Sequence, residues 1–193
     1  MKQLQALILA AGSSRRFPSN KLLQPLPDET CLLDISYHLA CSLTSQVLLV
    51  INADEQTQAH CRAQQYNYLI NAQAESGMAS SIVSGVMATA DADGWAILLA
   101  DMPCIKSSTL QLLAATWPAY EVTLPTYQHQ RGHPVFFSQQ WRSALCALNG
   151  DQGARSLLQD NPGVHQLEVD DPGVCFDIDS ETDWCNYIER GCA

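Results

Sequence analysis

The stretch LILAAGSSRRFPSNK, residues 7–21, determines the expected fold and points to a site. An apolar strand runs into the small residues Ala10, Ala11 and Gly12, and a basic segment follows. In an α/β sheet, ligands bind just past the carboxyl end of a strand, and a loop of small residues lets backbone N–H groups surround phosphates. The stretch fits neither the G-x-G-x-x-G spacing nor the G-x-x-x-x-G-K-[ST] spacing. We expect an anion-binding loop; the alternative is a plain strand-to-helix turn with incidental surface arginines. The basic residues are Arg15, Arg16 and Lys21.

On the C-terminal side of this stretch, apolar segments typical of strands alternate with helical patterns. Such alternation requires crossover connections, and therefore a mostly parallel sheet covered on both faces. Ser108 with Gln111, and Ser180 with Asp183, have the spacing of capping boxes that begin helices. Strands are expected at 5–9, 46–52, 68–71, 95–100 and 121–127, and helices at 32–43, 55–65, 78–90 and 110–117.

After residue 127 the pattern changes to short strands separated by turns, expected at 134–138, 164–169 and 174–177. We interpret them as an antiparallel extension of the same sheet. The chain contains no linker, fixed-period repeat or low-complexity segment. The pattern therefore predicts a single α/β domain over residues 1–193.

The charge balance limits the classes of partner. Ten basic and twenty acidic residues give a net charge of -10, which disfavours nucleic-acid binding, because that depends on neutralising phosphates. The apolar runs are too short to cross a bilayer, and the N-terminal run is shorter than a secretory core. We expect a cytoplasmic protein with neither a nucleic-acid nor a membrane partner.

Cysteine and histidine patterns give little support for zinc. The eight cysteines are widely spaced and form no CxxC pair, so buried free thiols are expected in a reducing cytoplasm. His129 and His133 are four residues apart, but both rings could reach one zinc ion only from a helix. Gly132 and Pro134 disfavour a helix there.

Two carboxylates are candidate magnesium ligands. Asp101 follows an apolar strand and precedes Met-Pro, so its side chain should emerge at the ligand edge of the sheet; the alternative is a cap for the helix near residue 107. Asp179 lies between Ile178 and the expected Ser180 cap; the alternative is a strand-end residue in a turn. Carboxylate oxygens suit Mg²⁺, and two of them could hold an ion that bridges reacting phosphates.

The loop also resembles a family signature. Residues 9–21 are similar to the L-A-[AG]-G-x-S-x-R-[MF]-G-x-x-K motif of the nucleotidyltransferase superfamily that includes the molybdenum cofactor cytidylyl- and guanylyltransferases. Pro18 departs from the motif, since the family usually has Gly there. The matching positions are Leu9, Ala10, Ala11, Gly12, Ser14, Arg16, Phe17 and Lys21.

Further motifs extend the resemblance over nearly the whole chain. SGMASS, residues 76–81, is similar to the family segment near the base and ribose, and LADMP, residues 99–103, to its metal-binding L-x-D-M-P. Residues 131–135, 150–155 and 177–180 resemble three motifs typical of the cytidylyltransferase branch. The resemblance implies a three-layer, Rossmann-like nucleotidyltransferase fold.

It also implies a role for each matching residue. Arg16 and Lys21 would neutralise the triphosphate during catalysis, while Asp101, with Asp179, would hold the metal. Residues 150–153 would form a helix N-terminus that receives the phosphate of the second substrate. The implied nucleotide-binding residues are Leu9, Ala10, Ala11, Gly12, Ser14, Arg16, Lys21, Ser76, Gly77, Met78, Ser81 and Asp101. The implied acceptor-binding residues are Gly132, His133, Asp151, Gly153 and Arg155.

The activity implied is Mg²⁺-dependent transfer of CMP from CTP to the phosphate of molybdopterin, with release of pyrophosphate. Guanylyl-transferring relatives carry Gly-Gly where this chain has Ala11-Gly12, and an extra methyl group crowds a purine more than a pyrimidine. The alternatives are guanylyl or other nucleotidyl transfer to a pterin or sugar phosphate, and a non-catalytic carrier that serves molybdoenzymes. A client molybdoenzyme is compatible with catalysis as well.

Overall fold

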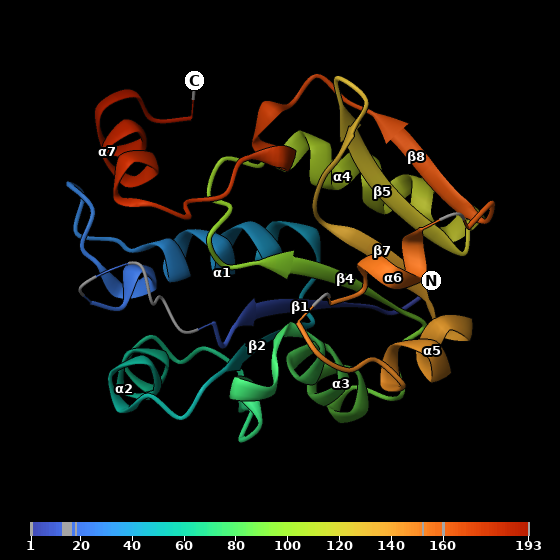
Figure 1. Ribbon diagram of the computed structural model, residues 1–193, viewed down its shortest axis with the longest axis horizontal. Helices are drawn as coiled ribbons and strands as arrows, with labels where there is room; N and C mark the ends of the chain where they lie inside the picture. Colours follow the sequence, from blue (N-terminus) through green and yellow to red (C-terminus); the bar gives the residue numbers. More distant parts are fainter. Residues whose placement is uncertain (1, 13–16, 18, 152, 160, 193) are drawn as a thin grey trace.

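The computed structural model describes residues 2–12, 17, 19–151, 153–159 and 161–192. Its centre is an eight-stranded sheet with the spatial order β3-β2-β1-β4-β7-β5-β6, in which β8 also pairs with β5 (Figure 1). The strands are β1 (Leu4–Ala10), β2 (Val47–Ile51), β3 (Tyr68–Ile70), β4 (Gly94–Leu99), β5 (Val122–Tyr127), β6 (Gln130–Arg131), β7 (Val135–Ser138) and β8 (Val164–Glu168).

The sheet has a parallel half and a mixed half. Strand β1 pairs in parallel with both β2 and β4, and β2 pairs in parallel with β3. Strand β7 lies antiparallel between β4 and β5, and β6 is antiparallel to β5. The expected antiparallel extension is therefore confirmed for β7 but wrong for β8, which runs parallel to β5, and β6 is an antiparallel strand that was not expected.

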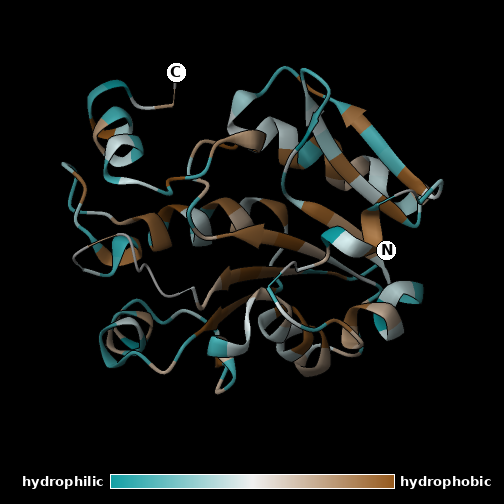
Figure 2. Cartoon of the chain, viewed as in Figure 1, coloured by the Kyte–Doolittle hydropathy of each residue, from teal (hydrophilic) through white to brown (hydrophobic). Residues whose placement is uncertain are grey.

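Helices cover both faces, which confirms the three-layer α/β class (Figure 1). Ala6 and Ile8 of β1 pack in one core cluster with α1 and α4, and the alternate residues Leu7 and Leu9 pack in a second cluster with α3 and α5. Figure 2 shows the central strands as the most hydrophobic part of the chain. The helices are α1 (Leu32–Leu43), α2 (Glu55–Ala63), α3 (Met78–Ala88), α4 (Ser107–Thr116), α5 (Arg142–Cys146), α6 (Arg155–Leu158) and α7 (Glu181–Arg190). The 3-10 helices are η1 (Lys21–Leu23), η2 (Ala74–Ser76), η3 (Trp117–Ala119), η4 (Gln139–Trp141) and η5 (Pro172–Cys175).

One of the two expected capping boxes is present. Ser180 caps α7, and the Ser180 N–H donates to Asp183 Oδ2 at 2.8 Å. The Ser108 box is wrong, because the N-cap of α4 is Lys106 and Ser108 lies inside its first turn. There Asp171 accepts hydrogen bonds from the Lys106 N–H at 2.9 Å and the Thr109 hydroxyl at 2.7 Å, contacts that no local pattern predicts.

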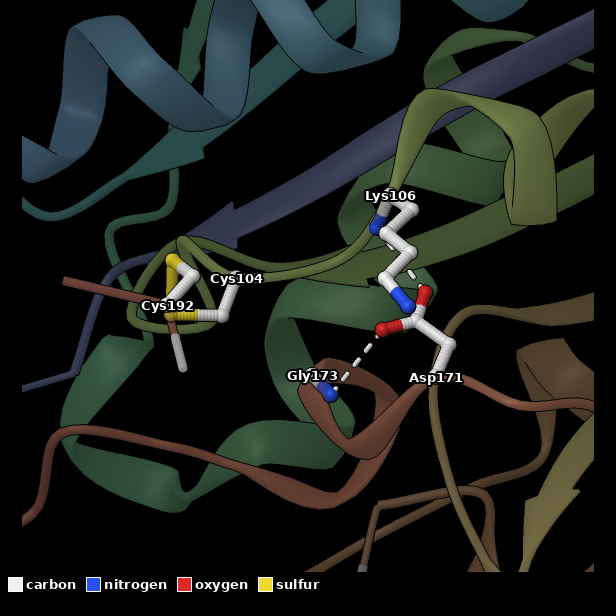
Figure 3. The surroundings of a disulfide bond; sticks show 5 residues. All are labelled: Cys104, Lys106, Asp171, Gly173 and Cys192. Carbon is white, nitrogen blue, oxygen red and sulfur yellow. Dashed lines mark hydrogen bonds between the residues drawn. A yellow bond between two sulfur atoms is a disulfide. The ribbon is translucent and has the colours of Figure 1, made fainter.

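The strand expected at 174–177 is wrong. The segment begins with η5, and Asp171 Oδ1 accepts from the Gly173 N–H at 3.0 Å (Figure 3). A Cβ on Gly173 would lie 2.0 Å from the Cys104 carbonyl oxygen, so this turn packs backbone to backbone on the loop after β4. Close packing of a turn replaces the strand ladder.

The expectation of free, buried thiols is only partly right. Cys104, in the loop after β4, and Cys192, beyond the end of α7, form a disulfide (Figure 3). Cys31 and Cys61 are buried and free, whereas Cys41 and Cys185 are free but exposed. None of the helices in the described part of the chain has the length and apolar character that crossing a membrane requires.

Candidate active site

The carboxyl ends of the four parallel strands share one edge, and a cavity of about 970 Å³ opens there. Gly12 follows β1, Asp54 follows β2, Asn71 follows β3 and Asp101 follows β4, and all four residues line it. The position is the one expected for ligands in open α/β sheets. Its volume suits a nucleotide-sized molecule.

The first strand and the start of α3 form two walls of this nucleotide-side cavity. Leu9 and Ala11 line it, as Gly12 does, while the side chain of Ala10 belongs to the core on the opposite face. Of the expected segment at 76–81, the residues Gly77, Met78 and Ser81 line the cavity, whereas Ser76 ends η2 and is not among its lining residues.

Gly77 joins two loops that are distant in sequence. Its φ is +101°, and an added Cβ would lie 2.2 Å from Asp151 Oδ1 and 2.6 Å from the Gly150 carbonyl oxygen. The Ala79 N–H donates to that same carbonyl at 3.2 Å. Only glycine allows this approach, which brings Asp151 to the cavity.

Only part of the first loop is described. The expected site residues Ser14 and Arg16 lie outside the described residues, and so do Arg15 and Pro18. Lys21 is described and buried; it does not project freely toward the cavity. Its Nζ donates to Asp101 Oδ2 at 2.8 Å and to the Ile178 carbonyl, and lies 3.7 Å from Asp179 Oδ1. The structure thus brings together Lys21, Asp101 and Asp179, three residues singled out separately in the sequence.

Asn20 fixes the backbone just before this lysine. Its Oδ1 accepts from the Leu22 N–H at 3.1 Å, and its Nδ2 donates to Thr57 Oγ1 at 2.9 Å. Thr57 in turn bonds to Asp54, the N-cap of α2. The position of α2 therefore sets the position of Lys21.

A third carboxylate, Asp177, completes an acidic group with Asp101 and Asp179. The Ile178 N–H donates to the Asp101 carbonyl oxygen at 3.0 Å, which holds 177–179 against the loop after β4. Burial raises the pKa of Asp177, and the charges of Asp179 and Asp101 raise it further. Neighbouring carboxylates raise one another's pKa because like charges repel, so this group favours a bound cation.

The rest of the cavity wall adds to the negative charge. Asp54, Glu75 and Asp151 line it as well, and its described lining residues include neither lysine nor arginine. Oxygen donors of this kind suit a hard divalent ion such as Mg²⁺. The donor set of Asp101 and Asp179 therefore fits the expected magnesium.

A second cavity, of about 1040 Å³, adjoins the first. Leu9, Met78, Leu99 and Asp151 line both, so the two share a wall. Of the expected acceptor residues, Gly132, His133, Asp151 and Arg155 line this acceptor-side cavity. Gly153 is not among its lining residues; an added Cβ there would lie 2.8 Å from Met78 Sδ, so Gly153 packs behind the shared wall.

His133 has an unusual environment in this wall. Its Nδ1 is buried and lacks a hydrogen-bond partner among the described residues, although its backbone N–H donates to the Val174 carbonyl at 2.8 Å. Burial lowers the pKa of the imidazole, which favours the neutral form. His129 lies in the turn before β6, so the two histidines share no helix, as the sequence predicts.

The helix N-terminus expected at 150–153 is wrong. Gly150 and Gly153 have φ values of +77° and +55°, which end rather than begin helical geometry. Helix α6 starts only at Arg155 and has four residues. Any anion contact here would come from the Arg155 side chain, not from a helix terminus.

Several lining residues of the two cavities were not predicted from the sequence. Asp54 and Asn71 could have been found, because each follows a strand that ends at the ligand edge. Asp177 and Arg131 belong to the 177–180 and 131–135 motifs, but neither was singled out as a site residue. Glu75 had no comparable signal, since it reaches the cavity only through the turn of η2.

Comparison with known proteins agrees with this geometry. Residues 6–168 match the MobA-like NTP transferase domain. The chain belongs to this family. It is therefore a nucleotidyltransferase of the MobA-like type, and its substrate class is a nucleoside triphosphate.

Two relatives in sequence match this MobA-like chain along most of its length. The purine catabolism protein PucB of Bacillus subtilis (strain 168) is 31% identical over 94% of each chain. The nicotine blue oxidoreductase of Paenarthrobacter nicotinovorans is 25% identical and covers 90% of this chain and 91% of its own.

A solved structure matches as well. Rv0371c of Mycobacterium tuberculosis H37Rv superposes with a TM-score of 0.83 and is 26% identical over 97% of this chain and 98% of its own. The same protein is known in complex with manganese, in a structure that superposes with a TM-score of 0.81 at 24% identity, over 98% of this chain and 100% of its own.

Proposed function

We propose that this MobA-like transferase moves CMP from CTP to the phosphate of molybdopterin and releases pyrophosphate, with Mg²⁺ as its metal. The observation that carries the proposal is the pair of joined cavities. One adjoins the Lys21–Asp101–Asp179 group, and the other is lined by Arg131 and Arg155. Two anionic substrates with a shared reacting centre need such an arrangement.

In the nucleotide-side cavity the chain binds and orients the triphosphate. Asp101 and Asp179 would hold the magnesium. The manganese complex of Rv0371c supports a divalent ion in this kind of protein. Magnesium bound there would neutralise the phosphate oxygens and polarise the α-phosphate. Lys21, which already neutralises Asp101, and Arg16 would add positive charge as the α–β bridge breaks. Their effect is electrostatic and greatest in the transition state.

In the acceptor-side cavity, Arg155 and Arg131 would hold the molybdopterin phosphate. An oxygen of that phosphate attacks the α-phosphorus of CTP, a new phosphoanhydride bond forms, and the bond to the bridging oxygen breaks, so that pyrophosphate leaves with the electron pair. The attacking oxygen is already ionised at neutral pH, so the chain need not remove a proton. The protein would contribute by aligning the acceptor phosphate with the α-phosphorus of CTP where the two cavities adjoin.

The choice of CTP rests on Ala11. This residue is buried and lines the nucleotide-side cavity, so its methyl group would leave less space for a base bound beside the strand. Discrimination by one methyl group is worth about 1–3 kcal/mol. That is enough to favour a pyrimidine over a purine, but not to exclude the purine.

The test is a pyrophosphate-release assay with the full chain, magnesium, molybdopterin and each of the four nucleoside triphosphates in turn. We expect release with CTP, and none when molybdopterin is omitted or the metal is chelated. Faster pyrophosphate release with GTP than with CTP would show that the chain transfers GMP rather than CMP. Triphosphate binding without release, whichever of the four is supplied, would instead support the non-catalytic carrier.

A further inference from the structure

A second group of metal-ligating side chains lies among α1, α2 and the core, outside both cavities. Cys31, Asp34 and His60 place one potential donor atom each within 4.8 Å of the others. Cys31 Sγ is 3.1 Å from Asp34 Oδ2 and 3.7 Å from His60 Nε2, and that nitrogen is 2.7 Å from Asp34 Oδ1. None of the three lines either cavity.

Local structure explains why these side chains meet. Cys31 is the N-cap of α1 and Asp34 occupies the third position of its first turn, where its carboxylate accepts from the Cys31 N–H at 3.1 Å. His60 comes from the last turn of α2. The Tyr66 hydroxyl donates to Asp34 Oδ1 at 2.8 Å and so orients the carboxylate from outside the group.

The donor types and their spacing suit zinc. Cysteine, histidine and aspartate are its usual ligands, at about 2.0–2.3 Å. Around a tetrahedral ion with bonds of that length, neighbouring donors lie about 3.3–3.8 Å apart. The sulfur–nitrogen distance of 3.7 Å already falls in this range. The other two distances require widening by less than about 1 Å, within the reach of side-chain rotation.

We propose that Cys31, Asp34 and His60 form a site for Zn²⁺, distinct from the magnesium site. The thiol donates a hydrogen bond to Asp34 and is therefore protonated without metal. Zinc binding forms a sulfur–zinc bond and releases the thiol proton to solvent. In the metal-free chain His60 Nε2 donates to Asp34 Oδ1. Zinc displaces that proton to solvent and the ring takes one up on Nδ1, so the imidazole adds nothing to the net proton release, and water occupies the fourth position. Tyr66 supports Asp34 as a hydrogen-bond donor outside the ligand shell.

Ligand softness separates the two sites. Thiolate and imidazole select zinc, whereas carboxylates alone suit magnesium or manganese. The ion would connect α1 to α2, and α2 holds Asn20, the neighbour of Lys21, through Thr57. Zinc is therefore expected to stabilise the wall of the nucleotide-side cavity without touching it.

Calorimetric titration of the full, chelator-treated chain with Zn²⁺ in excess magnesium tests the proposal. We expect one zinc ion and one released proton per chain, the proton being counted by comparing binding enthalpies in buffers of different ionisation enthalpy. In a thermal melt, Tm should rise by roughly 5–10 °C when free zinc is in hundredfold excess over Kd. Co²⁺ in place of zinc should show a thiolate-to-metal charge-transfer band. A chain that binds no zinc under these conditions overturns the proposal.

Three variants locate the ion. Cys31→Ser should abolish the charge-transfer band, and His60→Gln should weaken zinc binding at least about 100-fold, beyond the 10- to 100-fold typical of supporting residues. His60 is partly exposed, so its variant remains informative if Cys31→Ser fails to fold. Cys41→Ser removes an exposed thiol of the same helix and should bind zinc normally. Unchanged zinc binding in His60→Gln, a band that persists in Cys31→Ser, or equal loss in Cys41→Ser refutes the assignment.

Discussion

The two cavities share a wall but differ in charge. The nucleotide-side cavity is built on the parallel half of the sheet and lined by acids, with Asp101, Asp177 and Asp179 in one group. The acceptor-side cavity is built on the mixed half and carries Arg131 and Arg155. Among the described lining residues only the acceptor side offers arginines, so we expect a triphosphate to enter the acidic cavity together with a cation.

This difference suggests a division of work. On the proposed function, metal-dependent chemistry would use Asp101 from the parallel half together with Asp177 and Asp179 from the segment after η5. Recognition of the acceptor would instead use the segments that carry Arg131 and Arg155. Three substitutions test how complete this separation is.

The largest effect is expected for Asp101→Asn, which preserves shape and removes the charge of the carboxylate that we propose as the principal metal ligand. Turnover should fall by about 100- to 1,000-fold, the range for losing one transition-state electrostatic contact. Steady-state pyrophosphate release measures the fall in turnover. A thermal melt measures how much stability is lost with the ion pair between Asp101 and Lys21. Asp179→Asn is the matched control, since this carboxylate is 55% exposed and 3.7 Å from the lysine; its loss should be smaller. Normal turnover of Asp101→Asn would remove Asp101 from the metal site.

An intermediate effect is expected for Arg155→Ala. Losing a charge-assisted hydrogen bond of about 1.5–3 kcal/mol should raise the KM for molybdopterin by roughly 10- to 150-fold and leave CTP affinity nearly unchanged. Lys21→Ala is the contrasting variant, because it removes the cation beside Asp101 and should impair triphosphate handling with any acceptor.

Calorimetry with CTP and magnesium, beside kinetics in molybdopterin, separates the two variants. Equal loss of CTP binding in both would show that the cavities do not divide the substrates. His133 and Asp151 would then need reassignment to the nucleotide side or to structure alone.

The smallest effect is expected for Ala11→Gly. Removing the buried methyl group should relax the preference for CTP over GTP by about 10-fold, in line with other single-methyl discriminations. Competition between the two triphosphates in one reaction measures the ratio directly. Gly12→Ala is a useful comparison, because an added Cβ there would meet none of the described protein atoms within 4 Å and would narrow the cavity itself, so it should weaken binding of both triphosphates. If the ratio of CTP to GTP use is the same in Ala11→Gly as in the original chain, residues other than Ala11 determine which nucleotide is chosen.

Local patterns account for much of the fold. The helix at 32–43 was predicted with the bounds of α1, and each of the first five strands was placed within two residues. The parallel half follows from strand–helix alternation. The exceptions are informative: 174–177 has strand-like residues, but its first two residues belong to η5 and the rest forms no strand, since Gly173 packs against the Cys104 backbone. Packing between distant segments overrode local preference there.

The sequence by itself determined where the ligand edge lies and that Asp101 would reach it, because strand ends and small residues are local features with a known place in such sheets. Only the tertiary structure decided what meets there. Lys21 and Asp101 are 80 residues apart, and Cys104 and Cys192 are 88 apart. The Cys31–Asp34–His60 group likewise depends on how α2 packs beside α1. Residue spacing carries no information about such contacts, because they form only when the sheet brings remote loops to one edge and the helices cover its faces.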